Sequence, residues 1–124
     1  MNLLDSNIVI AAASGNDGVL DHIMLENPYA VSVVTRIEVL GFHRLTPEDK
    51  VDLQTFLTCG QELVLDEAVV TGAIRLRQER RMSLGDAIIA ATALAHDLPL
   101  LTRNVDDFKH IAGLKLKNPF APKA

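Results

Sequence analysis

The chain has 124 residues, of which 48% are hydrophobic and 23% charged, with a net charge of −4 and a single cysteine, Cys59. This length and composition fit one domain, residues 1–124, with a sizeable core; they exclude a disordered chain, and one cysteine excludes an internal disulfide. No apolar run reaches the roughly 20 residues of a membrane helix, and no signal-peptide pattern opens the chain, so we expect a cytoplasmic protein without membrane association.

The charges are unevenly distributed along the chain. Three basic and eleven acidic residues precede Arg75, a balance of −8, whereas nine basic and five acidic residues follow from Arg75 onward, a balance of +4. The negative total argues against nucleic-acid binding over the whole surface, but the second half can present one attractive face. Four arginines in the stretch IRLRQERR either form the solvent-exposed face of a helix or contact an RNA backbone: Arg75, Arg77, Arg80 and Arg81.

The first 60 residues contain signals for strands and helices in alternation. Short apolar or β-branched runs predict strands at 2–5 and 30–34. Thr35 is expected to cap a helix that continues through residue 45, with Glu38 at capping-box spacing, and Thr46-Pro47 marks a further helix start. Helices are also expected at 7–13 and 17–26, separated by the loop signal Ser14-Gly15-Asn16.

The second half continues the alternation. Strands are expected at 62–66 and 99–102, with a possible edge strand at 114–118 and a loose tail beyond Phe120. Asp66 should cap a helix that runs to about Arg81, and Ser83 should cap a nearly all-apolar helix that is buried on most sides. A short helix is expected at 105–110, and Cys59 is expected to pack as a small apolar residue.

This order of elements predicts the class of fold. Strands that alternate with helices form a mostly parallel sheet, here of four or five strands, with helices on both faces. In such sheets the functional crevice lies beyond the carboxyl ends of the strands. Polar side chains that follow strands are therefore the candidates for a site.

Acidic residues occupy several of these positions. Hard oxygen ligands without nearby Cys or His favour Mg²⁺ or Mn²⁺, and carboxylates gathered without interleaved bases repel each other unless a cation neutralises them. The candidates at or just past expected strand ends are Asp5, Glu38, Asp86, Asn104, Asp106 and Asp107.

Helix capping is the alternative explanation for each acid taken alone. Thr35 to Glu38 matches a capping box, and Ser83 to Asp86 is a weaker version of it. Asp is too short to be a favoured partner in that box, so capping explains Asp86 poorly. Asp5 can instead cap its own helix, and the sequence leaves both readings of Asp5 open.

Four segments carry a resemblance to a known family. LLDSNIVI, SVVTRIEVLGF, SLGDAIIAATALAHDLPLLTRN, and VDDF with a closing NPF resemble, in order and spacing, the motifs of PIN-domain ribonucleases. Within that family they are similar to the VapC-type toxins of type II toxin–antitoxin systems. The resemblance covers nearly the whole chain, and the combination of segments is more specific than any one of them.

The resemblance implies an α/β/α sandwich and a Mg²⁺- or Mn²⁺-dependent endoribonuclease. Asp5, Glu38 and Asp86 correspond to the family's catalytic, metal-binding carboxylates. Where relatives often have a fourth Asp, this chain has Asn104; Asp107 can replace it, and Asp106 is the weaker substitute. Supporting positions around the pocket are Ser6, Asn7, Thr102, Arg103 and Asn104.

The resemblance also implies partners: an RNA substrate, a small VapB-like antitoxin whose tail covers the acidic pocket, and a second copy in a homodimer. Three other functions stay open at this point. The chain can be a PIN nuclease of RNA processing without an antitoxin, a phosphoacceptor receiver domain with Asp66 as acceptor, or a non-catalytic binding module, which Asn104 favours.

Overall fold

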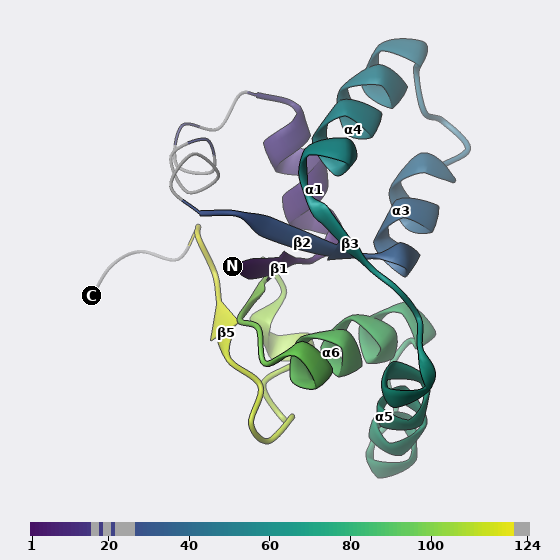
Figure 1. Cartoon of the computed structure of the whole chain (residues 1–124), viewed down its shortest axis with the longest axis vertical. Helices are drawn as coiled ribbons and strands as arrows, with labels where there is room; N and C mark the ends of the chain where they lie inside the picture. The colour runs from purple at the N-terminus through teal and green to yellow at the C-terminus, as the bar shows by residue number, and fades with distance from the viewer. Residues whose placement is uncertain (16–17, 19–20, 22–26, 121–124) are drawn as a thin grey trace.

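A computed structural model describes residues 1–15, 18, 21 and 27–120, and its centre is a five-stranded parallel sheet (Figure 1). The sheet order is β3-β2-β1-β4-β5, and every neighbouring pair is parallel. This confirms the predicted α/β class. The strands are β1 (Asn2–Leu4), β2 (Tyr29–Ser32), β3 (Gln61–Leu63), β4 (Leu100–Leu101) and β5 (Leu116–Lys117).

Helices cover both faces of the sheet and give three layers (Figure 1). On one face lie α1 (Ser6–Ala13), α3 (Val33–Leu40) and α4 (Pro47–Cys59). On the other lie α5 (Glu67–Glu79) and α6 (Leu84–His96), and a short 3₁₀ helix, η1 (Val105–Asp107), follows β4. Among the described residues, no helix is long and apolar enough to cross a bilayer.

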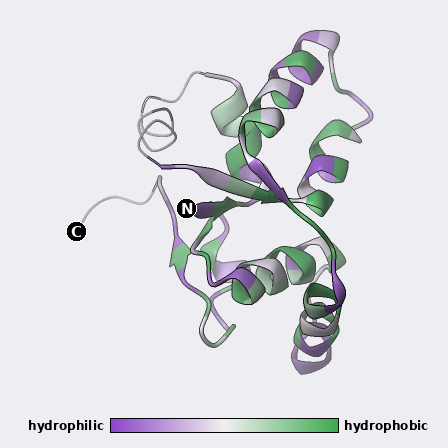
Figure 2. Cartoon of the chain, in the orientation of Figure 1, coloured by the Kyte–Doolittle hydropathy of each residue, from purple (hydrophilic) through white to green (hydrophobic). Residues whose placement is uncertain are grey.

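The hydrophobic core is divided in two by the sheet. Successive strand residues point to opposite faces, so Leu3 packs in the cluster under α5 and α6, whereas Leu4 packs in the cluster under α1, α3 and α4. In Figure 2 most of α1 has the colour of hydrophobic residues. As predicted, α6 is buried on most sides, because every residue from Ala87 to Ala93 is buried.

The boundary between β2 and α3 differs from the prediction. Ser32, not Thr35, is the N-cap: its Oγ accepts from the Val34 N–H at 3.2 Å, and the helix begins at Val33. Thr35 is fully buried inside the helix. Val33 and Val34 favour a strand by local preference, but the cap at Ser32 and the packing of Val34 against the core override it. The helix ends at Leu40, five residues earlier than expected.

Several other element ends also fall short of the prediction. β3 ends at Leu63 because its partner β2 ends at Ser32, the residue that pairs with Leu63. Beyond that pair Val64 and Leu65 are exposed. β4 covers only 100–101, η1 only 105–107, and α5 ends at Glu79. Cys59 is exposed, so its expected packing in the core was wrong.

The caps at Thr46, Asp66 and Ser83 are confirmed, since each side chain accepts from a backbone N–H in the first turn of its helix. The edge strand is confirmed too, as two residues of the predicted five. The predicted helix at 17–26 falls mostly outside the described residues, and so does the predicted tail at 121–124.

The strand order reverses beside β1. From β1 the chain adds β2 and β3 on one side, and then β4 and β5 on the other. Such a switch point is where open parallel sheets form a crevice at the carboxyl ends of their strands. Asp5 directly follows β1, Thr102 directly follows β4, and the Asp5 N–H donates to the Leu101 carbonyl at 2.9 Å.

Candidate active site

Asp5 is a buried carboxylate at the switch point, with 6% of its surface exposed. One carboxylate oxygen accepts from the Ser6 N–H at 2.8 Å, and the other accepts from the Thr102 hydroxyl at 2.7 Å and the Asn7 amide at 3.5 Å. In the described part of the chain no Lys or Arg forms an ion pair with it. Asp5 is also the N-cap residue of α1, so the capping role is confirmed. Metal binding by the same carboxylate stays a prediction.

Glu38 reaches the same region from α3. Its Oε1 accepts from the Ser6 hydroxyl at 2.8 Å, which links it to the residue beside Asp5. Its Oε2 lies against Gly85 of α6, where a Cβ would come within 3.0 Å of that oxygen. Because Ser32 caps α3, the capping-box explanation of Glu38 was wrong, and the carboxylate has no capping role to explain its position.

Asp86 lies in the first turn of α6, where the Ser83 hydroxyl accepts from its backbone N–H at 3.1 Å. Burial raises the pKa of the Asp86 carboxyl, and the neighbouring Asp5 carboxylate raises it further. The Ser83 hydroxyl lowers this pKa, while the more distant charges of Asp107 and Glu38 add to the increase. The four carboxylates are therefore close enough to repel each other.

Asp107 is the carboxylate from the segment after β4 that faces this group. The neighbouring Asp106 instead pairs with Lys109 at 3.2 Å and is highly exposed. Asn104 is exposed as well; its backbone N–H donates to the Thr102 hydroxyl at 3.0 Å. Among the described residues its side-chain amide forms no hydrogen bond with the acids. Asp107 is exposed too, but its charge adds to the rise in the Asp86 pKa, which makes it a better candidate than Asn104 for the fourth acidic position.

The carboxylates suit a hard divalent cation by chemistry, because they offer only oxygen donors. Within the described ranges, no three acidic, His or Cys side chains are arranged to hold one metal ion together. Magnesium in proteins commonly takes one or two carboxylates and completes its shell with water. Asp5 and Asp86 fit that pattern, because the Asp5 charge acts on the Asp86 carboxyl.

The predicted supporting residues contact the acids or each other. Ser6 donates to Glu38, while Thr102 and Asn7 both donate to Asp5. The Asn7 Oδ1 also accepts from the Arg103 N–H at 3.3 Å, which ties the loop after β4 to α1. The sequence reasoning missed Gly85. The sequence does contain a signal for it. A glycine in the first turn of a helix destabilises the helix relative to alanine, so its presence there indicates that another group approaches the backbone closely.

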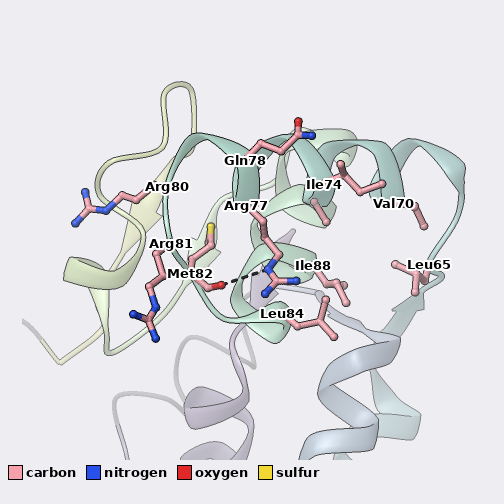
Figure 3. A pocket seen from close by; sticks show the side chains of 11 residues that line it. Leu65, Val70, Ile74, Arg77, Gln78, Arg80, Arg81, Met82, Leu84 and Ile88 are labelled. Carbon is pink, nitrogen blue, oxygen red and sulfur yellow. Dashed lines mark hydrogen bonds between the residues drawn. The ribbon is translucent and has the colours of Figure 1, made fainter.

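The four arginines near the end of α5 lie around a different feature. Three of them, Arg77, Arg80 and Arg81, line a groove of about 730 Å³ whose apolar walls include Ile74 and Leu84 (Figure 3). Arg77 donates to the Met82 carbonyl at 3.3 Å, as the dashed line in Figure 3 marks. Arg75 is not part of that lining and forms an exposed pair with Glu79 at 4.0 Å.

Comparisons with known proteins identify the family. The family model of the PIN domain matches residues 3–114. A protein of Mycobacterium tuberculosis named Ribonuclease VapC10 is 34% identical over 98% of this chain and 94% of its own length. Ribonuclease VapC1 of Rickettsia felis is 30% identical over 92% of both chains.

Solved structures agree with this result. A toxin–antitoxin complex from Klebsiella pneumoniae contains a chain with 30% identity and a TM-score of 0.80, covering 97% of this chain and 98% of that one. The structure of VapBC2 from Rickettsia felis bound to a promoter DNA fragment contains a chain with the same fold. Its TM-score is 0.84 at 22% identity, and the match covers 94% of this chain and 97% of that one. The chain therefore belongs to the PIN-domain family and, within it, to the VapC group.

Proposed function

We propose that this protein is a Mg²⁺- or Mn²⁺-dependent endoribonuclease and the toxin of a toxin–antitoxin pair. One observation carries the proposal: Asp86 lies within reach of the charges of Asp5, Asp107 and Glu38, which come from three other segments, and these charges add to burial in raising its pKa. The names of the VapC relatives support the nuclease activity.

The chemistry follows from the carboxylates. Hydrolysis of a phosphodiester needs an activated water, a polarised phosphate and a stabilised leaving oxygen, and a bound divalent ion supplies all three. Asp5 and Asp86 would hold that ion, and Thr102 and Asn7 keep the Asp5 carboxylate oriented. Glu38 and Asp107 would orient water and accept its proton. Cleavage of this kind leaves a 5′-phosphate and a 3′-hydroxyl.

A groove beside the carboxylates supports an antitoxin partner. It has a volume of about 400 Å³ and is lined by residues of α1, α3 and α4 and by the loop before α4. Ile10 and Phe42, which line it, are 55% and 53% exposed, while Asp49, Asp52 and Glu38 make it acidic. An apolar segment with basic side chains would complement this surface, and its contact with Glu38 would block the site. The solved VapBC complexes support the same partner.

A homodimer is part of the proposal. The apolar groove between α5 and α6, with Ile74 and Leu84 more than half exposed, supports such a contact. No specific observation favours RNA processing without an antitoxin. Asn104 favours a non-catalytic module, but Asp107 offers a carboxylate that can replace the missing one. The receiver-domain alternative loses its phosphoacceptor, because the Asp66 carboxylate caps α5 through the Val69 N–H at 3.0 Å.

One assay tests the proposed activity. Purified protein is incubated with total cellular RNA and Mg²⁺ or Mn²⁺, with EDTA as the metal-free control, and the cut ends are mapped. We expect 5′-phosphate ends only with the metal, and a loss of more than about 100-fold in rate for Asp5→Asn, since even residues behind a metal ligand cost 10–100-fold. Asp106→Asn is the matched control, because Asp106 pairs with Lys109 and should leave cleavage unchanged. Full activity of Asp5→Asn would refute the assignment.

A further inference from the structure

Arg103 is held at three points in the loop that follows β4. Its N–H donates to the Asn7 Oδ1 at 3.3 Å, and its carbonyl accepts from the Asn118 amide at 3.5 Å. Its guanidinium lies 4.1 Å from the centre of the Phe120 ring, a cation–π contact. The backbone and the side chain of this exposed arginine are therefore both restrained.

The segment that restrains Arg103 runs from Asn118 to Phe120 and is itself anchored. It directly follows β5, and the Lys117 carbonyl accepts from the Thr102 N–H at 3.0 Å. The Asn118 Oδ1 accepts from the Phe120 N–H at 2.9 Å. The Asn118 side chain therefore bonds both to the backbone of Arg103 and to the backbone of Phe120, whose ring the guanidinium contacts. The Phe120 ring packs against the core cluster that contains Leu101, which fixes the ring on which the guanidinium stacks.

In the part of the chain that the structure describes, no carboxylate pairs with Arg103. The neighbouring Thr102 does contact a carboxylate, because its hydroxyl donates to Asp5. The contrast is Arg36, whose guanidinium forms two hydrogen bonds with Glu62. The Phe120 ring lies against the Arg103 guanidinium, and within the described residues no group accepts a hydrogen bond from its N–H groups. These N–H groups are therefore available for a phosphate.

We propose that the segment Asn118–Phe120 positions Arg103 to bind a phosphate of the RNA backbone next to the carboxylate centre. This inference rests on the proposed nuclease function and adds to it a phosphate subsite and its positioning residues. Arg103 lies one residue after Thr102, which bonds to Asp5, so a phosphate on Arg103 belongs to a nucleotide that flanks the cut. Asn118 and Phe120 act through Arg103 without contacting RNA themselves.

The test compares Arg103→Met, Phe120→Leu, Phe120→Tyr and the double variant of Arg103→Met with Phe120→Leu. Cleavage of a fluorogenic single-stranded RNA gives kcat and KM at several salt concentrations, and fluorescence anisotropy in EDTA gives RNA binding without cleavage. Thermal unfolding shows that each variant is folded. Phe120→Leu keeps an apolar side chain in the core cluster but removes the ring, whereas Phe120→Tyr keeps the ring.

Arg103→Met should raise KM and the RNA Kd about tenfold, as expected for a lost charge-assisted hydrogen bond, with kcat little changed. It should also reduce the salt slope of log(kcat/KM) by about 0.7, the contribution of one contact to single-stranded RNA. Phe120→Leu should raise KM about threefold, in line with an exposed cation–π contact, and Phe120→Tyr should match the wild type. In the Arg103→Met background, Phe120→Leu should have no further effect on KM.

Three results would overturn the inference. If Phe120→Leu or Arg103→Met lowers only the unfolding temperature and leaves KM, Kd and the salt slope unchanged, the segment is structural and Arg103 binds no phosphate. Additive effects of the two substitutions would show that Phe120 does not act through Arg103. A wild-type protein that neither binds nor cuts RNA would overturn the proposed function together with this inference, whereas normal wild-type cleavage with unaffected variants would overturn the inference alone.

Discussion

Two aspartates of the site show how surroundings decide what a residue does. Asp5 is buried, yet its oxygens accept from Ser6, Thr102 and Asn7, so it has hydrogen-bond partners in place of a cation. Asp86 is partly buried beside Asp5, and its pKa is raised. Burial is the main cause, the charge of Asp5 adds to it, and a bound divalent ion would offset that charge.

Asp86→Asn should stabilise the metal-free protein at neutral pH. A carboxyl whose pKa is higher in the folded chain than its ordinary value of 3.8 binds its proton more tightly when folded. The stability that this gives is complete below the ordinary pKa and is lost as the pH rises through the raised pKa, because Asp86 must then ionise. In EDTA, the unfolding temperature of the variant should exceed that of the wild type at pH 7, and the difference should shrink toward pH 4. An equal or lower value for the variant at pH 7 would contradict the role of Asp86.

The sequence predicted that acids following separate strands would converge. Asp5, Glu38 and Asp86 follow expected strands, and in the structure the charges of Asp5 and Glu38 reach Asp86. Their catalytic and metal-binding roles stay a prediction. The sequence preferred Asp107 to Asp106 but could not decide between Asn104 and Asp107 for the fourth acidic position. In the structure Asp106 pairs with Lys109, in line with that preference. The Thr35 cap was wrong because Ser32, three residues earlier, offers the same hydroxyl at the true end of the strand.

At the scale of elements, the start of α6 organises the site. Ser83 caps the helix, Gly85 gives the Glu38 carboxylate room, and Asp86 presents its own carboxylate one residue later. The helix dipole favours negative charge at this end, which offsets part of the repulsion. The first turn of α6 therefore lies beside Glu38 of α3, and its Asp86 carboxyl is within reach of the charge of Asp5, which follows β1.

Gly85→Ala should separate stability from activity. Alanine is a better helix former by about 1 kcal/mol, so the helix itself should not be weakened. The new Cβ would lie 3.0 Å from the Glu38 Oε2, and the carboxylate would have to move. Urea unfolding should show equal or slightly higher stability, while metal-dependent cleavage should fall by about tenfold or more, as for other disturbed metal surroundings. Unchanged cleavage would remove Glu38 from the mechanism.

Helix starts were easier to predict than strand ends. Thr46 with Pro47, Asp66 and Ser83 are local signals, because a cap bonds to N–H groups only a few residues away. Strand ends depend on partners far away in sequence. The run at 62–66 looks like a strand throughout, but pairing stops at Leu63 because β2 offers no residue beyond Ser32.

At the scale of the whole molecule, the alternation of strands and helices was sufficient to predict a parallel α/β sheet. The sheet order, with its reversal at β1, depends on the pairing of distant strands and was not predicted. The grooves could not be predicted either, because an exposed Ile74 or Phe42 has the same sequence signature as a buried one. The segments that converge on Arg103 are separated by about a hundred residues at the widest, between Asn7 and Asn118.

The uneven charge distribution predicts how salt affects RNA binding. Arg75 pairs with Glu79 and Arg77 bonds to Met82, so Arg80 and Arg81 should contribute most. Neutralising these two together should reduce the slope of log K against log[salt] by up to about 1.4, at roughly 0.7 per contact. Neutralising Arg36, which Glu62 already neutralises, is the control and should leave the slope unchanged. An unchanged slope for the Arg80 and Arg81 variant would place RNA elsewhere.

We expect carboxylates from separate segments to share one divalent ion, and calorimetric titration with Mn²⁺ measures that binding. The wild type should bind Mn²⁺, and Asp5→Asn and Asp86→Asn should each weaken the affinity by more than about tenfold. Asp106→Asn should bind as the wild type does, since that carboxylate pairs with Lys109. If Asp5→Asn and Asp86→Asn bind Mn²⁺ as tightly as the wild type, the carboxylate group at the switch point is not a metal site and the central claim is wrong.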